Sequence, residues 1–233
     1  MRIDAFLRVP PGRPGPAAAK TKSVPPIVAP RPAALPQPQP AKEALAAAPA
    51  ASWIEVYTDG ACEGNGTPRA RGGVGVAFPE RPDLNVSEPL PPVGSKGPDG
   101  TQGLKHTNNR AELTAILRAL QVVDERLDTG RTRPVRLRTD SMLCVNTFTK
   151  WLAGWKRVGG GPARVVGPRD VVVVKLVKRD GSPVLNTDLI LAVEARLRLR
   201  RVEFVHVRAH TGRSDEASRF NALADELAVT SVT

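Results

Sequence analysis

Proline and alanine make up half of the first 50 residues, and from Ala29 to Pro40 a proline stands at nearly every second position. Proline fixes φ and removes a backbone donor, so neither a helix nor a sheet can extend through such a stretch. The segment also lacks the apolar side chains that could offset the entropy of ordering it. We therefore predict a disordered, partly polyproline-II tail over residues 1–50 and a folded domain over residues 51–233.

The tail carries a formal charge of about +5, which leaves its role open. It could tether the protein electrostatically to nucleic acid, act as a docking arm, or serve only as a solvated spacer. Its first eight residues could also be read as an organelle-targeting peptide, although Asp4 and the early prolines weaken that interpretation.

The charge and the cysteines restrict the class of protein. A formal net charge of +11 favours nucleic acid or another polyanion as a partner. No apolar run approaches the roughly 18 residues of a membrane span, so no membrane association is expected.

Two cysteines far apart, Cys62 and Cys144, argue against a disulfide scaffold or a cysteine-based zinc site. They favour a reducing intracellular compartment such as the cytoplasm or nucleus.

Hydrophobic periodicity predicts an α/β domain. Residues 53–59 and 73–78 alternate as strands, and apolar residues at helical spacing from Leu113 to Val123 indicate a helix capped by Asn108 or Asn109. We expect further strands at 135–140 and 202–207, and helices at 141–151, 186–199 and 221–229. Residues 79–106, with at most one short strand, and 158–177, which contain the unplaced run Val171–Val174, are expected to be insertions. The order ββ(β)αβααβα predicts a mixed sheet with helices packed on it.

Four acidic residues stand where such a sheet can bring them together. Asp59 and Asp140 each end a predicted strand, Glu112 lies in the first turn of the long helix, and Asp225 lies in the final helix. Neighbouring strands that run the same way would place Asp59 and Asp140 at one sheet edge. Taken singly, an aspartate at a strand end is usually a turn residue, and a glutamate in a first turn usually serves the helix dipole.

Convergence of these carboxylates would have a clear chemical meaning. Close carboxylates repel one another, so their pKa values rise unless cations neutralise them. Hard oxygen ligands select Mg²⁺ or Mn²⁺. Two such ions, roughly 3.5–4 Å apart, suit phosphodiester cleavage.

Six segments, in this order, resemble motifs of the type 1 ribonuclease H family: Tyr57–Gly66, Thr107–Leu113, Thr139–Ser141, Trp151–Arg157, His210–Gly212 and Asn221–Leu227. The resemblance implies a ribonuclease H-like fold, with a mixed five-stranded sheet flanked by helices. It also implies an endonuclease that hydrolyses the RNA strand of RNA–DNA hybrids by a two-metal-ion mechanism and leaves 5′-phosphate and 3′-hydroxyl ends. The implied ligands of two Mg²⁺ ions, with Mn²⁺ as a possible substitute, are Asp59, Glu112, Asp140 and Asp225. His210 would assist proton transfer or product release.

The same resemblance implies contacts to each strand of a hybrid. Short groups would test for the 2′-hydroxyl of RNA, with Gly60 allowing close backbone approach; the matching positions are Cys62, Asn65, Asn108 and Asn109. Thr107 and Asn186 match a phosphate pocket for the DNA strand, with Lys105 as its basic neighbour. Trp151 and Trp155 share a helix face beside Lys156, and they either pack in the core or face DNA. Met142 resembles the eukaryotic branch of the family.

The chain also departs from the family pattern. The segment from His210 to Asp225 is about five residues longer than usual, which puts the role of His210 in doubt, and residues 158–177 interrupt the basic region around Trp155. No hybrid-binding module is visible in residues 1–50. Processive cleavage is therefore expected to be weak, unless the basic tail substitutes for that module.

Three other functions stay open at this stage. The chain could be a different nuclease on the same fold, such as a transposase, integrase or junction resolvase. It could be a cleavage domain detached from a reverse transcriptase, or a module that binds hybrids without cutting them. We expect a monomer whose partner is an RNA–DNA hybrid, with no small-molecule cofactor. Its task could be R-loop removal, primer removal in DNA replication, or viral replication.

Overall fold

The computed structural model describes residues 52–92, 94–95, 105–160, 162–165, 171–208 and 215–232. The predicted tail and His210 lie outside these residues.

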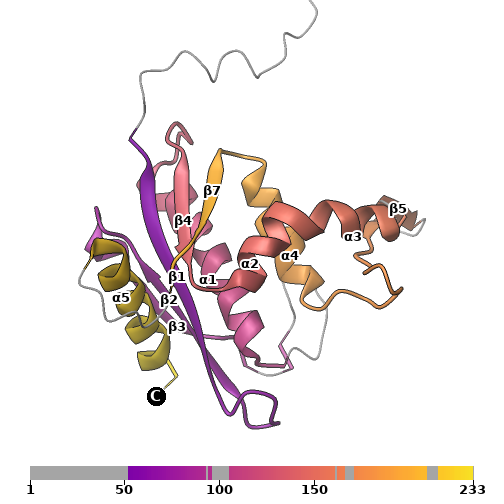
Figure 1. Cartoon of the computed structure of the whole chain (residues 1–233), viewed down its shortest axis with the longest axis horizontal. Helices are drawn as coiled ribbons and strands as arrows, with labels where there is room; N and C mark the ends of the chain where they lie inside the picture. The colour runs from indigo at the N-terminus through magenta and orange to yellow at the C-terminus, as the bar shows by residue number, and fades with distance from the viewer. Residues whose placement is uncertain are drawn as a thin grey trace, which may run out of the picture. The chain divides into compact units, whose positions relative to one another are not determined.

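The five-stranded sheet has the order β3-β2-β1-β4-β7 (Figure 1). Its strands are β1 (Ile54–Glu63), β2 (Arg71–Ala77), β3 (Val86–Pro89), β4 (Val135–Thr139) and β7 (Val202–His206). β1, β2 and β3 form an antiparallel meander, whereas β4 runs parallel to β1, and β7 parallel to β4.

Helices cover both faces of this sheet. α1 (Asn108–Val122) packs on β1 and β2, with α4 (Thr187–Leu197) beside it. α5 (Glu216–Thr230) packs on β1, β2 and β3 from the other face (Figure 1). A third helical run consists of α2 (Met142–Asn146), a π-helical turn (Thr147–Trp151) and α3 (Leu152–Val158). The predicted fold, a mixed five-stranded sheet flanked by helices, is confirmed.

Apolar alternation places the core between the sheet and α1. Val56 of β1 and Leu137 of β4 are fully buried, as are Leu113, Ile116 and Leu120 of α1. The three α1 residues lie at i, i+3 and i+7, which puts them on one face of the helix. The apolar face of α1 therefore packs on β1 and β2, and Leu137 of β4 belongs to the same core.

Several element boundaries differ from the sequence expectation. β1 continues to Glu63, because Gly60–Glu63 pair with β2. The N-cap of α1 is Thr107, not Asn108 or Asn109, since the Thr107 hydroxyl accepts from the Arg110 backbone N–H at 3.2 Å. The helix expected at 141–151 runs on to Val158 through the π-helical turn. α5 begins at Glu216, because Asp215 caps it by accepting from Ser218 N–H.

The two predicted insertions adopt short local structures. Residues 79–106 contain a 3₁₀ turn (Pro82–Leu84) and β3. Residues 158–177 contain an antiparallel pair, β5 (Pro162–Val165) and β6 (Val171–Val174), whose strands form a separate two-stranded sheet. The Val171–Val174 run, which sequence patterns could not place, is therefore a strand of this local hairpin.

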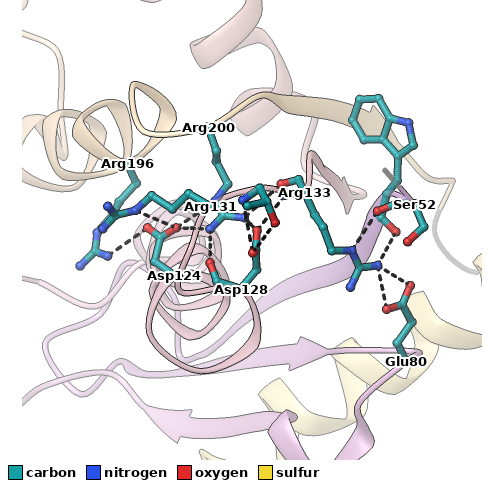
Figure 2. Close-up of polar contacts among 10 residues, drawn as sticks. Ser52, Glu80, Asp124, Asp128, Arg131, Arg133, Arg196 and Arg200 are labelled. Carbon is teal, nitrogen blue, oxygen red and sulfur yellow. Dashed lines mark hydrogen bonds and ion pairs between the residues drawn. The ribbon is translucent and has the colours of Figure 1, made fainter. Parts of the chain in front are cut away.

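A buried guanidinium joins three elements at the amino ends of β4 and β7 (Figure 2). The side chains of Arg200 and Asp124 are each only 1% exposed. Arg200 Nε donates to Asp124 Oδ1 at 2.9 Å, and its Nη1 donates to Asp128 Oδ2 at 2.8 Å and to the Arg133 carbonyl at 3.1 Å. Arg196 of α4 donates to the other oxygen of Asp124 at 3.1 Å. The cluster therefore links the end of α1, the start of β4 and the α4–β7 connection.

Charge complementarity keeps Asp128 ionised within this cluster. Burial raises the pKa of the Asp128 carboxyl, but the backbone N–H groups of Arg133 and Thr132 and the Arg200 guanidinium lower it. The net result is a pKa below the ordinary value. A buried ion pair of this kind is costly to break from one side, because the remaining charge stays in a poorly solvated place.

No helix among the described residues is both long enough and apolar enough to cross a membrane.

Arg200→Gln is expected to lower the free energy of unfolding by about 3–5 kcal/mol, because it removes donors from two buried carboxylates. Urea unfolding followed by circular dichroism measures this change. The matched control is Arg198→Gln, whose side chain is 70% exposed in an i,i+4 pair with Glu194. That control is expected to cost less than about 0.5 kcal/mol. Equal losses in both variants would contradict the assigned role of the buried cluster.

Candidate metal centre and adjoining cleft

The parallel pairing of β1 with β4 brings Asp59 and Asp140 to one edge of the sheet. Thr58 pairs with Thr139 in the register of these two strands. Asp59 and Asp140 are the next residues along the two strands. Both therefore lie at the same end of the β1–β4 pair. The sequence expectation for these two residues required neighbouring parallel strands, and the sheet provides them.

Glu112 reaches the same point because Gly60 has no side chain. A Cβ atom at Gly60 would lie 2.2 Å from Glu112 N and 2.4 Å from the Ala111 carbonyl carbon. Only glycine permits this backbone contact between β1 and the first turns of α1. Asp59, Glu112 and Asp140 each offer a ligand oxygen, and these atoms all lie within 4.8 Å of one another.

Asp225 approaches the cluster from the opposite face through α5. Gly75 of β2 pairs with Asp59, and a Cβ atom at Gly75 would lie 1.9 Å from the Ala224 carbonyl oxygen. α5 therefore rests on the backbone of β2 beside Asp59, and the residue after Ala224 is Asp225. The charge of Asp225 and a hydrogen bond with it both contribute to raising the pKa of Asp59. All four carboxylates singled out from the sequence thus share one neighbourhood.

Burial and mutual repulsion make the ionised cluster unfavourable by itself. Burial, followed by the charge of Asp140, raises the pKa of Asp59 to about 7, although the Gly60 backbone N–H opposes the rise. Burial, followed by the charges of Asp59 and Asp140, raises the pKa of Glu112 to about 9. Such shifts arise where several carboxylates lack a compensating cation.

The donor set fits hard divalent cations. Glu112 is 5% exposed, and its Oε2 is buried without a hydrogen-bond partner in the described part of the chain. A buried carboxylate oxygen without a donor is costly unless a ligand satisfies it. Clustered carboxylate oxygens are the ligands that Mg²⁺ and Mn²⁺ prefer. Asp59, Glu112 and Asp140, with Asp225 beside them, could therefore hold such ions.

Two further residues contact Asp140, and sequence reasoning assigned neither of them a role. His206 Nε2 lies 3.1 Å from the Asp140 carbonyl oxygen, which can only accept, so this nitrogen donates. Asn221 Nδ2 donates to Asp140 Oδ2 at 3.4 Å. Asn221 precedes Asp225 by four residues, and that i,i+4 spacing was the available signal that both face the cluster.

The residues matched to 2′-hydroxyl recognition gather where the β1–β2 turn meets α1. Cys62 is half-buried near the end of β1, and burial raises the pKa of its thiol. Asn65 Oδ1 accepts from the Asn108 backbone N–H at 3.3 Å, which joins the turn to the start of α1. Asn65, Asn108 and Asn109 are exposed. Met142, 45% exposed, begins α2 two residues after Asp140.

A cleft of about 850 Å³ adjoins this turn. It is lined by residues from α1, the α2–α3 run and α4, including Lys105, Thr107, Asn109, Trp151, Trp155 and Asn186. The indole rings of Trp151 and Trp155 are 5.6 Å apart, and Trp151 is 40% exposed. Trp155 also packs against the core, which is one of the two roles that the sequence left open, while contact with DNA stays a prediction.

A buried ion pair shapes the floor of this cleft. Both Nη atoms of Arg110 donate to the Asp188 carboxylate, and the two side chains are 8% and 5% exposed. Arg110 Nη1 also donates to Asn186 Oδ1 at 3.2 Å, which leaves the Asn186 NH₂ group as a donor. Lys156, by contrast, is not among the cleft-lining residues and forms an ion pair with Glu194 of α4.

Comparison with known families matches nearly all of the folded part. A family model described as RNase H matches residues 51–233. A probable ribonuclease H of Acanthamoeba polyphaga mimivirus is 33% identical over 165 residues, which cover 71% of this chain and 60% of the viral protein. Human Ribonuclease H1 is 31% identical over 169 residues, which cover 72% of this chain and 48% of the human protein. The matched part of the chain thus spans about half to three fifths of these two relatives.

A solved structure supports the fold. The crystal structure of LC9-RNase H1, described as a type 1 RNase H with the type 2 active-site motif, superposes with a TM-score of 0.51 at 24% identity. The superposition covers 79% of this chain and 74% of that one.

Glu112→Gln is expected to raise the melting temperature of the EDTA-treated protein at pH 8 and to leave it unchanged at pH 4. The folded-state pKa of about 9 exceeds the ordinary 4.5, so the folded protein binds this proton more tightly than the unfolded chain. The resulting stability is fully present below pH 4.5 and is lost as the pH rises toward 9. The Glu112→Gln substitution removes this loss of stability. Each kcal/mol of unfolding free energy regained raises the melting temperature by about 2–4 °C in a domain of this size.

Calorimetry at the two pH values measures the effect. Glu226→Gln, at an exposed position of α5, is the matched control and is expected to change neither melting temperature. A Glu112→Gln variant that melts below the unsubstituted protein at pH 8 would contradict the buried repulsion described here.

Proposed function

The chain belongs to the ribonuclease H family, and from that premise we propose that it is an endonuclease that hydrolyses the RNA strand of RNA–DNA hybrids. The proposed products carry 5′-phosphate and 3′-hydroxyl ends. The observation that carries the proposal is the buried convergence of Asp59, Glu112 and Asp140, with Glu112 Oε2 unsatisfied within the described residues. A site built of carboxylates alone has few uses besides holding cations.

Asp59, Glu112, Asp140 and Asp225 would hold two divalent ions, Mg²⁺ or in its place Mn²⁺. When bound, such ions lower the pKa of an attacking water and neutralise charge on the departing 3′ oxygen. The protein's own contribution is preorganisation. The Gly60 and Gly75 contacts fix the carboxylates on rigid elements before substrate arrives, so little reorganisation is needed during the reaction.

Selection of RNA would come from the turn beside the carboxylates. Asn65 and Asn108 are held together by a hydrogen bond, and exposed Asn109 follows them on α1. Amide groups can both donate to and accept from a 2′-hydroxyl, the group that DNA lacks. Short side chains at this place are suited to a test of each sugar close to the scissile bond.

The DNA strand would lie along the cleft next to this turn. Thr107, the NH₂ group of Asn186 and Lys105 offer phosphate donors, and Trp151 and Trp155 offer flat apolar surface. The net charge of +11 supports long-range attraction of a polyanion. The two strands of a hybrid would therefore meet different chemistry, with amides and carboxylates on one side and donors with aromatic rings on the other.

Cleavage assays test the proposal directly. Purified protein is expected to cut only the RNA strand of an end-labelled RNA–DNA hybrid, and not double-stranded RNA, single-stranded RNA or double-stranded DNA. EDTA is expected to abolish cutting, because the carboxylates alone provide no electrophile. Asp140→Asn is expected to reduce cutting below detection, whereas Asp83→Asn, an exposed matched substitution, retains it.

Two outcomes would overturn the proposal in different ways. Hybrid binding without cutting, with Mg²⁺ or Mn²⁺ present, would identify a binding module. Cutting of double-stranded DNA would identify a different nuclease on this fold and remove the argument from the 2′-hydroxyl.

Trp151→Ala is expected to weaken hybrid binding about 5- to 30-fold, the effect of removing an aromatic anchor worth roughly 1–2 kcal/mol. Fluorescence anisotropy with labelled hybrid, in the Asp140→Asn background, measures affinity without cleavage. Trp53→Ala is the control, because Trp53 precedes β1 at the end remote from Asp59. Equal weakening by both substitutions would contradict a DNA-facing role for Trp151.

A further inference from the structure

The side-chain amide of Asn221 lies between α5 and the metal centre. Asn221 is 5% exposed, and its Nδ2 donates to Asp140 Oδ2 at 3.4 Å. Its Oδ1 is buried and has no hydrogen-bond partner in the described part of the chain. One half of this amide is therefore engaged with a carboxylate of the cluster, and the adjacent half is unsatisfied.

The packing of α5 explains how Asn221 reaches this position. Ala224 and Ala228 rest on the backbone of Gly75, so α5 lies unusually close to β2. Asn221 and Asp225 are four residues apart and project from one face of the helix. The same helix thus presents one carboxylate and one amide to the cluster.

Stability does not account for an asparagine here. A buried polar atom without a partner lowers stability, and an apolar residue of the same shape avoids that cost. The weak 3.4 Å hydrogen bond to Asp140 offsets little of it. An amide that is unfavourable in the isolated protein indicates a partner that arrives with the ligand.

Among the described residues, the other side chain that hydrogen-bonds Asp140 engages its backbone. His206 of β7 donates to the Asp140 carbonyl oxygen, a contact that restrains the main chain and not the carboxylate. Asn221 is the described residue that hydrogen-bonds the Asp140 carboxylate itself. Its NH₂ group holds Oδ2 and thereby directs the other oxygen.

We propose that Asn221 is a positioning residue for the metal centre: its NH₂ group orients the Asp140 carboxylate, and its buried oxygen accepts a hydrogen bond from the hydration shell of the bound cation. This inference rests on the proposed divalent-metal site. Mg²⁺ usually keeps several of its waters when bound by carboxylates, so an acceptor beside the ligands has a natural partner. Outer residues that orient metal ligands typically contribute 10- to 100-fold in metal affinity.

The test compares metal binding and stability in Asn221→Leu, without substrate. Calorimetric titration with Mn²⁺ is expected to give roughly tenfold weaker binding than in the unsubstituted protein. The melting temperature in EDTA is expected to be equal or higher, since an unsatisfied polar group has been removed. With hybrid as substrate, kcat is expected to fall at low Mg²⁺ and to recover at high Mg²⁺, while KM for the hybrid stays unchanged.

Two further variants separate a positioning role from a structural one. Asn146→Leu is the matched control, because Asn146 also has a buried amide oxygen without a partner but no hydrogen bond to a carboxylate among the described residues. It is expected to leave Mn²⁺ affinity unchanged. Asn221→Asp places a fourth carboxylate against Asp140, so it is expected to lower the melting temperature in EDTA and to enlarge the stabilisation by Mn²⁺.

Each contrary result has a distinct meaning. If the unsubstituted protein shows no response to Mg²⁺ or Mn²⁺, the proposed metal site itself fails. If it responds and Asn221→Leu binds Mn²⁺ equally well, only the role of Asn221 is overturned. A Leu variant that loses its folded circular dichroism signal would also overturn it, because the amide would then be needed for folding.

Discussion

Direct contact between helix and strand backbones, at Gly60 and at Gly75, determines whether Glu112 and Asp225 reach Asp59. At Gly60 the first turns of α1 touch β1, and at Gly75 the middle of α5 touches β2 from the opposite face. Side chains at either position would hold the helices several ångströms away, and Glu112 or Asp225 would no longer reach Asp59. The parallel β1–β4 pairing then adds Asp140. The chemistry of the site thus depends on two places where no side chain exists.

This arrangement concentrates negative charge at one end of the sheet, and the rest of the fold has to offset it. The apolar layer between α1 and the sheet stabilises the fold, and the Arg200 cluster joins α1, β4 and β7 at the opposite end. In the Arg200 cluster, opposite charges are paired and hydrogen-bonded. At the metal centre the neighbouring charges have the same sign, and Glu112 Oε2 has no hydrogen-bond partner among the described residues. The two ends of the same strands therefore serve opposite purposes, one holding the fold together and the other holding a ligand.

Sequence patterns predicted what depends on periodicity and missed what depends on individual hydrogen bonds. The alternation after Trp53 and the helical stripe from Leu113 to Val123 were sufficient for the sheet and α1, and the expected parallel strands placed Asp59 beside Asp140. Thr107 displaced Asn108 as the N-cap because of one hydroxyl contact, and Lys156 was drawn to Glu194 by an ion pair between helices. The contact of Asn221 with Asp140 joins residues 81 apart; the i,i+4 spacing to Asp225 indicates the helix face of Asn221 but not this partner. The prediction for His210 falls outside the described residues and stays a prediction.

The docking of α5 has a consequence for the order of events during synthesis and folding. Ser87 of β3 donates to the Leu227 carbonyl across 140 residues of sequence, and Asn221 meets Asp140 across 81. Contacts of such separation form slowly, because long loops must close before any contact repays their entropy. A growing chain therefore holds Asp59, Glu112 and Asp140 for some time before residue 225 exists to join them. The acidic cluster is complete only when folding is nearly complete, so an unfinished chain carries no finished nuclease site.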